Sequence, residues 1–260
     1  MHETTPQVFL IARPAVAAEA MRDYLSRVGG EQWLNDRLSG GEVPAAELLV
    51  EFAGRACYRS WKAGLNPNVT RVREDRGEYF ANILASAHGS VLEHASFTFV
   101  LHDVSRAFTH ELVRHRAGTA VSQESLRYVR LSDIGFRVPP ALAPLRERVL
   151  NVVEQLEELQ VEAANKLGLD RDGVPFAVKK EVTSALRRLA PIGLSTDVVW
   201  SANLRTLRHV IELRTAPGAE EEMRLVFDRV AHTMQAETPD LFQDFMRGQD
   251  GSWIPQHSKV

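Results

Sequence analysis

Apolar side chains at alternating or helical spacing divide the first third of the chain into elements. Residues 8–12 read Val-Phe-Leu-Ile-Ala, and this short apolar run predicts a strand. Segments with one polar face follow as far as residue 53 and predict helices, which Gly-Gly pairs at 29–30 and 40–41 interrupt. Residues 75–88 return to helical spacing. We therefore expect mainly helices in this part of the chain.

The next stretch changes from strand to helix to loop. Residues 96–101 are rich in aromatic and β-branched side chains, which favours a strand. Asp103 is placed to cap a helix that runs to about Arg116. Residues 117–131 have weak periodicity and many small or polar side chains, so they predict a loop.

The second half of the chain is expected to be mostly helical. A long helix is predicted after Pro139-Pro140, and five apolar residues at spacings of three and four are expected to form its buried face: Leu145, Val149, Val152, Leu156 and Leu159. Helices are also expected over 176–188, 204–214 and 219–236, with an extended segment at 196–202. Because strands and helices do not alternate regularly, the pattern predicts an α+β fold. No linker interrupts the chain, so we expect a single domain over residues 1–260.

Composition narrows the classes of protein to consider. Hydrophobic residues make up 44% and charged residues 25% of the 260 residues, which is typical of a globular protein. The net charge of −3 argues against a general nucleic-acid binder, so any anion site must be local. No run of 18 apolar residues exists, so no membrane span is expected. The single cysteine, Cys57, fits a reducing cytoplasm.

The segment richest in candidate chemistry follows the predicted helix end at Arg116. It holds three arginines, a histidine and two serines, and reads Arg114-His115-Arg116-Ala117-Gly118-Thr119-Ala120-Val121-Ser122-Gln123-Glu124-Ser125-Leu126-Arg127-Tyr128. Arginine forks bind phosphate with two hydrogen bonds, and loop N–H groups add more. The segment therefore suggests a phosphate or nucleotide site. The alternative is that Arg114 and Arg116 only complement the dipole at the helix C-terminus.

Two further polar clusters are candidates. Asn203, Arg205, His209 and Arg214 follow Trp200, and the spacing of four between Arg205 and His209 puts both on one helix face. This face either holds an anionic ligand or is simply solvated. The other cluster is His88-Gly89-Ser90 with Glu93-His94. Its spacing does not place two metal ligands on one helix face, so we expect no metal site.

Nucleophilic catalysis has little support in the sequence. Cys57 lies between apolar residues, where a lone cysteine is usually part of the core. The chain has no Gly-x-Ser-x-Gly elbow, no Gly-x-Gly-x-x-Gly and no Walker loop.

Several ordered motifs together resemble the flavin-dependent thymidylate synthases. The family hallmark is Arg-His-Arg, seven residues, then Ser and a final Arg-Tyr. This chain matches it with Arg114-His115-Arg116 and Ser125-Leu126-Arg127-Tyr128. Segments around Cys57, His88, Trp200 and Phe242 match further family patterns, so the resemblance covers roughly residues 50–246.

The resemblance implies a fold, an activity and a role for each matching residue. It implies C5 methylation of a uracil nucleotide, with FAD as cofactor, methylenetetrahydrofolate as carbon donor, NADPH as reductant, and a homotetramer. The implied FAD contacts are His88, Ser90, Arg114, His115, Arg116, Asn203, Arg205 and His209. The implied nucleotide contacts are Glu111, Arg114, Gln123, Ser125, Arg127, Arg187 and Arg214, of which Arg214 would face the uracil ring as the catalytic residue. Because the flavin supplies the hydride, no cysteine nucleophile is required.

Two departures from the family pattern bear on the substrate. Eight residues instead of seven separate Arg116 from Ser125, and Glu111 stands where the family usually has Gln. Both changes lie on the nucleotide side, and they favour the subtype that methylates UMP in nucleoside-antibiotic pathways such as that of polyoxin. A dUMP-specific thymidylate synthase remains the alternative. A nucleotide- or RNA-binding module without catalysis is a third, but only Tyr128 offers an aromatic ring beside the arginines.

Overall fold

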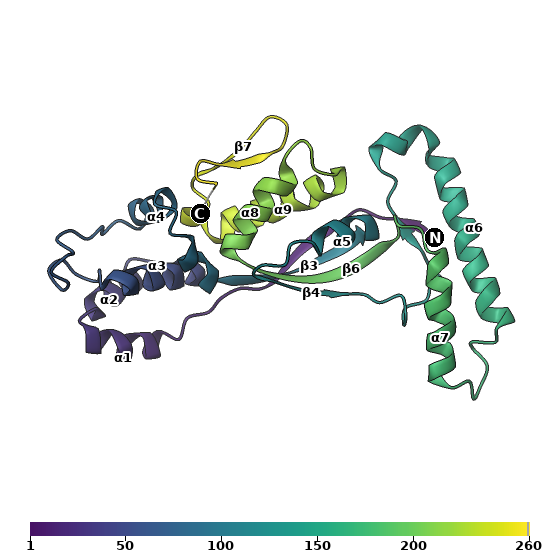
Figure 1. Ribbon diagram of the computed structural model, residues 1–260, viewed down its shortest axis with the longest axis horizontal. Helices are drawn as coiled ribbons and strands as arrows, with labels where there is room; N and C mark the ends of the chain where they lie inside the picture. Colours follow the sequence, from purple (N-terminus) through teal and green to yellow (C-terminus); the bar gives the residue numbers. More distant parts are fainter. Residues whose placement is uncertain (259) are drawn as a thin grey trace. The chain divides into compact units, whose positions relative to one another are not determined.

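The computed structural model describes residues 1–258 and 260, and they form an α+β fold as predicted. Figure 1 shows the long strands of the main sheet and the helices that precede and follow them along the chain. Four strands form the main sheet in the order β2-β3-β6-β4, with the bounds Gln7–Ala12, Ser96–Ser105, Ser195–Asn203 and Thr119–Gln123. Two short pairs complete the strands: β1 (His2–Glu3) with β5 (Gly135–Phe136), and β7 (Phe245–Arg247) with β8 (Trp253–Pro255).

By their internal contacts, the residues group into two compact units, and each of the four strands of the main sheet contributes residues to both. The first unit comprises residues 1–9, 99–116 and 121–200. The second comprises residues 10–98, 117–120 and 201–260.

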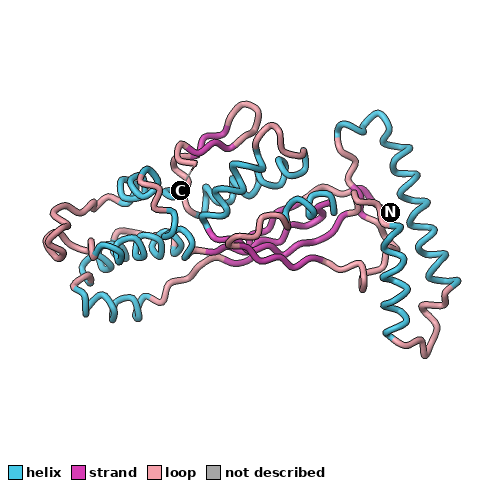
Figure 2. The backbone as a smooth tube through the Cα atoms, in the orientation of Figure 1, coloured by secondary structure: helices cyan, strands magenta, loops and turns pink. Residues whose placement is uncertain are grey.

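The first unit contains α5 (Arg106–Leu112) and the helices α6 (Arg146–Lys166) and α7 (Phe176–Leu186), with short turns of 3-10 helix at Pro140–Leu145 and Arg187–Leu189. Helices α6 and α7 lie side by side (Figures 1 and 2). A core cluster in this unit includes Leu126, Ile134, Phe136 and Val153, all with little exposed surface, and Val153 lies on α6. This packing positions the loop after β4 against α6.

The second unit contains the remaining helices: α1 (Ala18–Val28), α2 (Glu31–Ser39), α3 (Ala45–Tyr58), α4 (Arg76–Ala85), α8 (Leu204–Thr215) and α9 (Glu221–Glu237), with 3-10 turns η1 (Gly89–His94) and η4 (Pro239–Leu241). Helices α8 and α9 pack against each other, and η1 packs against both α3 and α8. A cluster around Trp33, Leu48 and Trp61 joins the first three helices. Among the described residues, none of the helices combines the length and apolar character that crossing a bilayer requires.

The prediction that Asp103 caps a helix was wrong. Strand β3 continues to Ser105, and it is the Ser105 hydroxyl that accepts the Phe108 N–H at 3.0 Å to cap α5. Asp103 has a φ of +57° within the strand. Its backbone N–H donates to Asp197 Oδ1 at 3.1 Å, and this long-range bond, invisible in the sequence, stabilises the unusual backbone.

The predicted loop at 117–131 was partly wrong, because it contains β4. This strand is at the edge of the sheet, and its residues are exposed or half-buried on both faces, so no apolar alternation marks it. Backbone hydrogen bonds hold both ends: Asn203 donates to Gly118 O and Glu124 donates to Asp197 O, each at 3.0 Å.

The predicted buried face of the long helix was wrong by about one position. Leu145, Val152 and Leu159 are 54%, 51% and 43% exposed, whereas Val153 and Gln160 are buried. Gln160 can be buried because its Nε2 donates to the Leu186 carbonyl at 2.9 Å, across to α7. The apolar stripe of α6 is wide, and periodicity alone does not tell which part of it faces the core.

Candidate functional site

Strand β6 and helix α5 hold the predicted nucleotide segment at Glu124. The Arg106 Nη2 donates to the Glu124 carbonyl at 2.9 Å, and the Glu124 N–H donates to Asp197 O at 3.0 Å. The residue after Glu124 is Ser125, whose Oγ accepts from the Arg127 N–H at 3.4 Å. These contacts hold the backbone of Glu124 at the edge of the sheet. They therefore fix the position from which Ser125 and Arg127 continue.

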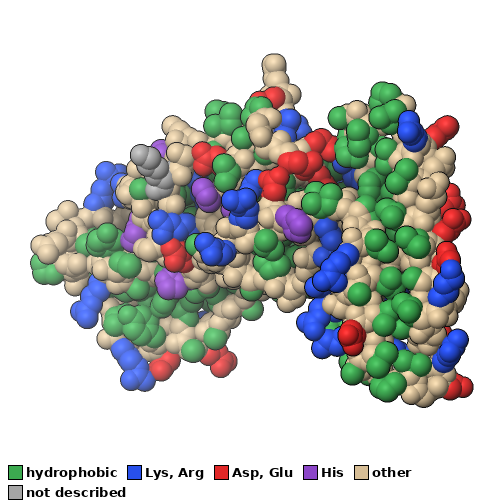
Figure 3. Space-filling view, turned by 45° about the vertical axis from the view of Figure 1, so that its right-hand side comes forward, with side chains coloured by type: hydrophobic (Ala, Val, Ile, Leu, Met, Phe, Trp, Pro, Cys, Tyr) green, Lys and Arg blue, Asp and Glu red, His purple; other side chains and the backbone are tan. Residues whose placement is uncertain are grey.

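Arg127 and Arg187, both predicted nucleotide contacts, line the same open hollow of 460 Å³. The other charged side chains that line it are Lys180, Glu181 and Arg188. Figure 3 shows basic side chains gathered beside the apolar side chains of the part formed by α6 and α7. Within the part of the chain that the structure describes, none of the four cations that line the hollow, Arg127, Lys180, Arg187 and Arg188, forms an ion pair. An un-neutralised cluster of this kind is suited to bind an anion.

Arg106 extends this cluster and was missed in the sequence. Burial lowers the pKa of Arg106, the nearby Glu124 opposes that effect, and the positive charge of Arg187 lowers it further. The Nε of Arg106 is buried and has no hydrogen-bond partner among the described residues. One signal was available: a basic residue in the first turn of a helix opposes the helix dipole, so Arg106 directly after the Ser105 cap calls for an anionic partner.

The remaining candidates in the first unit lie around α5 and β4. Gln123 Nε2 donates to the Thr109 hydroxyl at 3.2 Å, which ties β4 to α5. Glu111 is half-buried on α5, and its carbonyl accepts the Arg114 N–H at 3.3 Å. His115 is half-buried, while Arg114 and Arg116 are exposed just after the helix.

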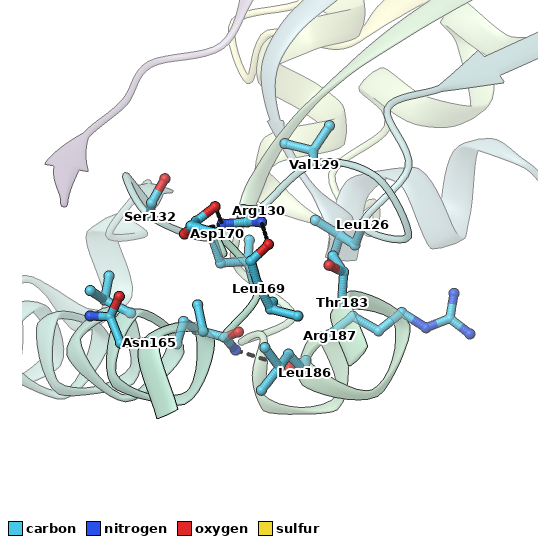
Figure 4. Close-up of a pocket in the computed structure, with 14 residues that line it drawn as sticks. Leu126, Val129, Arg130, Ser132, Asn165, Leu169, Asp170, Thr183, Leu186 and Arg187 are labelled. Carbon is cyan, nitrogen blue, oxygen red and sulfur yellow. Dashed lines mark hydrogen bonds and ion pairs between the residues drawn. The ribbon is translucent and has the colours of Figure 1, made fainter. Parts of the chain in front are cut away.

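A partly open cavity of 280 Å³ lies between α6, α7 and the loop around Leu126 (Figure 4). Its lining is mostly apolar, and the ion pair of Arg130 with Asp170 at 2.6 Å lies on one side. Arg187 also lines the cavity, but in Figure 4 its guanidinium points away from the other labelled side chains. The cavity therefore does not have the charges that a nucleotide phosphate needs.

In the second unit, the predicted flavin contacts centre on α8 and η1. The Asn203 Oδ1 accepts the Thr206 N–H at 2.9 Å and so caps α8. Arg205 Nη1 forms an ion pair with Glu93 of η1 at 2.6 Å. His209 lies one turn after Arg205 on the exposed side of α8. The structure thus brings Arg205 to η1, which follows His88 and contains Ser90.

Two glycines allow close packing beside these side chains. A Cβ at Gly89 would lie 2.9 Å from Arg205 Nε and 2.2 Å from the carbonyl carbon of Val260. A Cβ at Gly118, whose φ is +66°, would lie 2.4 Å from Asn203 Nδ2. The exposed arginine, imidazole and hydroxyl groups and the half-buried Asn203 amide are donors of the kind that a dinucleotide needs, so this set fits FAD. His88 also contacts an aromatic ring, with the Tyr58 and His88 centroids 5.9 Å apart.

Two other side-chain groups bear on metal binding and nucleophilic chemistry. His102 is bracketed by Asp197, 2.8 Å from Nδ1, and by Asp103, 3.3 Å from Nε2. The contact between His102 and Asp197 links β3 to β6. The expectation that Cys57 is a core residue was wrong: the thiol is exposed, because it lies on the outer side of α3 near its C-terminus.

Residues 41–240 match the family described as thymidylate synthase complementing protein. The chain belongs to this family. Its relatives include the flavin-dependent thymidylate synthases of Mycobacterium marinum and Mycobacteroides abscessus, each 36% identical over 209 residues, which cover 78% of this chain and 81% of the relative. The fold also matches the crystal structure of a UMP/dUMP methylase PolB from Streptomyces cacaoi bound with 5-Br UMP. That match has a TM-score of 0.61 and 18% identity, and covers 93% of this chain and 94% of the other.

Proposed function

We propose that this chain is a flavin-dependent enzyme that methylates C5 of a uracil nucleotide. Membership of the thymidylate synthase complementing family and the names of the mycobacterial relatives support the activity. The observation on which the proposal depends most is the hollow lined by un-neutralised cations at the end of the Arg-His-Arg segment. That hollow offers a charged site for the phosphate of a nucleotide.

We assign binding of the nucleotide phosphate to Arg127 and Arg187, with Arg106 beside them. All three are guanidinium groups, so they can donate paired hydrogen bonds to phosphate oxygens. Arg106 lies close enough to Arg187 for the positive charge of Arg187 to lower its pKa, so an anion beside the two guanidinium groups relieves their repulsion. Ser125 adds a hydroxyl next to Arg127.

We assign the flavin to the group formed by His88, Ser90, Asn203, Arg205 and His209, with Arg114, His115 and Arg116 as further contacts. When bound, FAD supplies the hydride that converts the transferred carbon into a methyl group. The side chains of the protein bind the cofactor and orient it. The Glu93 carboxylate holds Arg205, and Asn203 fixes the first turn of α8, from which Arg205 and His209 project.

Arg214 is assigned to the uracil ring. It lies in the last turn of α8, on the same helix as Arg205 and His209. A guanidinium facing the ring carbonyl stabilises the negative charge that develops when C5 reacts, and it needs no proton transfer to do so. The exposed Cys57 has no part in this assignment.

The finer identity of the substrate rests on the two sequence departures, the longer loop and Glu111. The extra residue lies in 117–124, a region that includes β4, and Glu111 lies on α5, which β4 contacts through Gln123. We infer that the longer segment leaves room or a hydrogen-bond partner for a 2′-hydroxyl, and we therefore propose UMP as well as dUMP. Methylenetetrahydrofolate and NADPH are the proposed co-substrates, and a homotetramer is the proposed assembly.

A competition assay tests the proposed function and the substrate together. Purified protein, FAD, methylenetetrahydrofolate and NADPH are mixed with equal UMP and dUMP, and the 5-methyl products are read by mass. Both products are expected. Only the deoxy product would make the chain dUMP-specific, and no product with either nucleotide would contradict the enzyme assignment.

A further inference from the structure

The hollow beside α7 carries more positive charge than one nucleotide needs. Arg127, Lys180, Arg187 and Arg188 line it together with the carboxylate of Glu181, which gives a net charge of +3. A uracil 5′-monophosphate brings a charge of about −1.5 to −2 at neutral pH. With Arg106 also beside Arg187, at least one cation is left over when the nucleotide is bound.

An exposed aromatic pair lies next to these surplus charges. The rings of Tyr128 and Phe176 are stacked, with centroids 6.2 Å apart and planes inclined by 10°. Tyr128 is 54% and Phe176 is 68% exposed. Two large aromatic side chains are rarely left this open unless their surface has a use.

Cations and rings share the same surface. Lys180 Nζ lies 5.5 Å from the Tyr128 ring centroid, and Arg127 Cζ lies 5.8 Å from it. Phe176, Lys180 and Ser184 follow one another at spacings of four along α7, so they lie on one face of that helix. Stacking rings next to basic side chains form the arrangement that binds a planar base carrying phosphate.

We propose that this face of α7 is a second subsite, which binds an adenosine phosphate through stacking on Phe176 and Tyr128 and charge pairing with Lys180 and Arg188. The inference rests on the proposed function, in which the reductant NADPH carries such a group, an adenosine with a 2′-phosphate. Arg127 and Arg187 hold the uracil nucleotide, and Lys180 and Arg188 select the 2′-phosphate. The Glu181 carboxylate, also in the hollow, accepts a hydrogen bond from a ribose hydroxyl in this arrangement.

Binding of adenosine 2′,5′-bisphosphate, measured by calorimetry, tests this subsite without requiring turnover. The full-length protein is first saturated with dUMP, so that the uracil site is filled. We expect the bisphosphate to bind still, and to bind more tightly than 5′-AMP. Phe176→Ala and Lys180→Gln should each weaken it by about fivefold or more, the scale for one stacked base or one charge-assisted contact.

Matched variants separate a specific contact from a general effect. Lys179→Gln removes a lysine charge next to Lys180 but outside the hollow. Val178→Ala shortens another exposed apolar side chain of α7. Both variants should bind the bisphosphate as the unaltered protein does. Phe176→Trp should keep affinity because it keeps an aromatic face. Circular dichroism checks that each variant is folded.

The outcomes distinguish this inference from the proposed function. Methylation without any bisphosphate binding in the presence of dUMP would overturn the subsite and leave the function intact. Binding that depends on Phe176 and Lys180 would support the subsite even if no methyl product forms. If both variants raise the KM for methylenetetrahydrofolate and leave bisphosphate binding unchanged, the surface serves the folate and the proposal is wrong.

Discussion

Replacing Glu47 with glutamine should make the protein more stable at alkaline pH but not at acidic pH. Glu47 is fully buried on α3. One carboxylate oxygen accepts the Asp240 N–H at 2.8 Å, while the other, Oε2, has no hydrogen-bond partner among the described residues. Arg76 is 3.5 Å from Oε2, but it also pairs with Asp240. The carboxylate is therefore buried with only partial compensation.

Burial raises the pKa of Glu47 from 4.5 to about 7, although the Asp240 N–H and Arg76 oppose the shift. The folded protein thus binds this proton more tightly than the unfolded chain. Its contribution to stability is complete below pH 4.5 and is lost as the pH rises through about 7. A shift of this size corresponds to an upper bound of about 3 kcal/mol.

The Glu47→Gln variant keeps an oxygen that can accept the Asp240 N–H, and it stays neutral at every pH. We expect it to match the unaltered protein near pH 5 and to exceed it by about 1–3 kcal/mol at pH 8.5. Thermal unfolding should show this as a gain of about 2–4 °C per kcal/mol. A difference in melting temperature that is the same at both pH values, or a loss at pH 8.5, would refute the reasoning.

Glu51 provides a control one turn along the same helix. Burial alone would raise the pKa of Glu51, but hydrogen bonds and the charges of Arg37 and Arg55 hold it below its usual value. Glu51→Gln leaves Arg55, which is 1% exposed, with a buried and uncompensated charge. It should therefore destabilise the protein at pH 8.5 by about 3–5 kcal/mol, opposite in sign to Glu47→Gln.

Three further substitutions test the site. Arg106→Gln should weaken UMP and dUMP binding about tenfold in calorimetry, because the phosphate loses a charge-assisted contact. FAD binding should be unchanged. An equal loss of nucleotide and FAD binding would mean that Arg106 has a structural role. Arg214→Ala should keep FAD, followed by flavin fluorescence, and lower kcat about a hundredfold; normal kcat would remove Arg214 from the mechanism. Cys57→Ala should keep full activity, since its exposed Sγ makes only a 3.4 Å contact to the Ala53 carbonyl; an inactive, folded variant would show that a thiol takes part.

The elements that the sequence predicted well are those with strong local signals. The strand at Ser195–Asn203 alternates buried and outward residues, and the helix after it begins with an asparagine cap, so both were predictable from neighbouring residues. Strand β4 was not, because an edge strand of small and polar residues has no buried face to create a pattern. Its position depends on hydrogen bonds to Asn203 and Asp197, which are remote in sequence.

In the candidate site too, some residues could be predicted from the sequence and others could not. Arg127 and Arg187 were named from motifs, and they line one hollow although sixty residues separate them. Arg106 was missed because its significance comes from the proximity of Arg187 and from a buried Nε without a partner, both of which are tertiary facts. The resemblance supplied residue identities, whereas the surplus charge around α7 required the structure.

The most direct test of the central claim is a single turnover with chemically reduced flavin, which needs no NADPH. Protein loaded with FAD is reduced with dithionite under anaerobic conditions and then mixed with methylenetetrahydrofolate and UMP or dUMP. The nucleotide products are identified and quantified by mass spectrometry. The account predicts about one 5-methyl nucleotide for each reduced flavin, and none when FAD is left out. Product that forms equally well without FAD, or no product from the fully reduced holoenzyme, would contradict it.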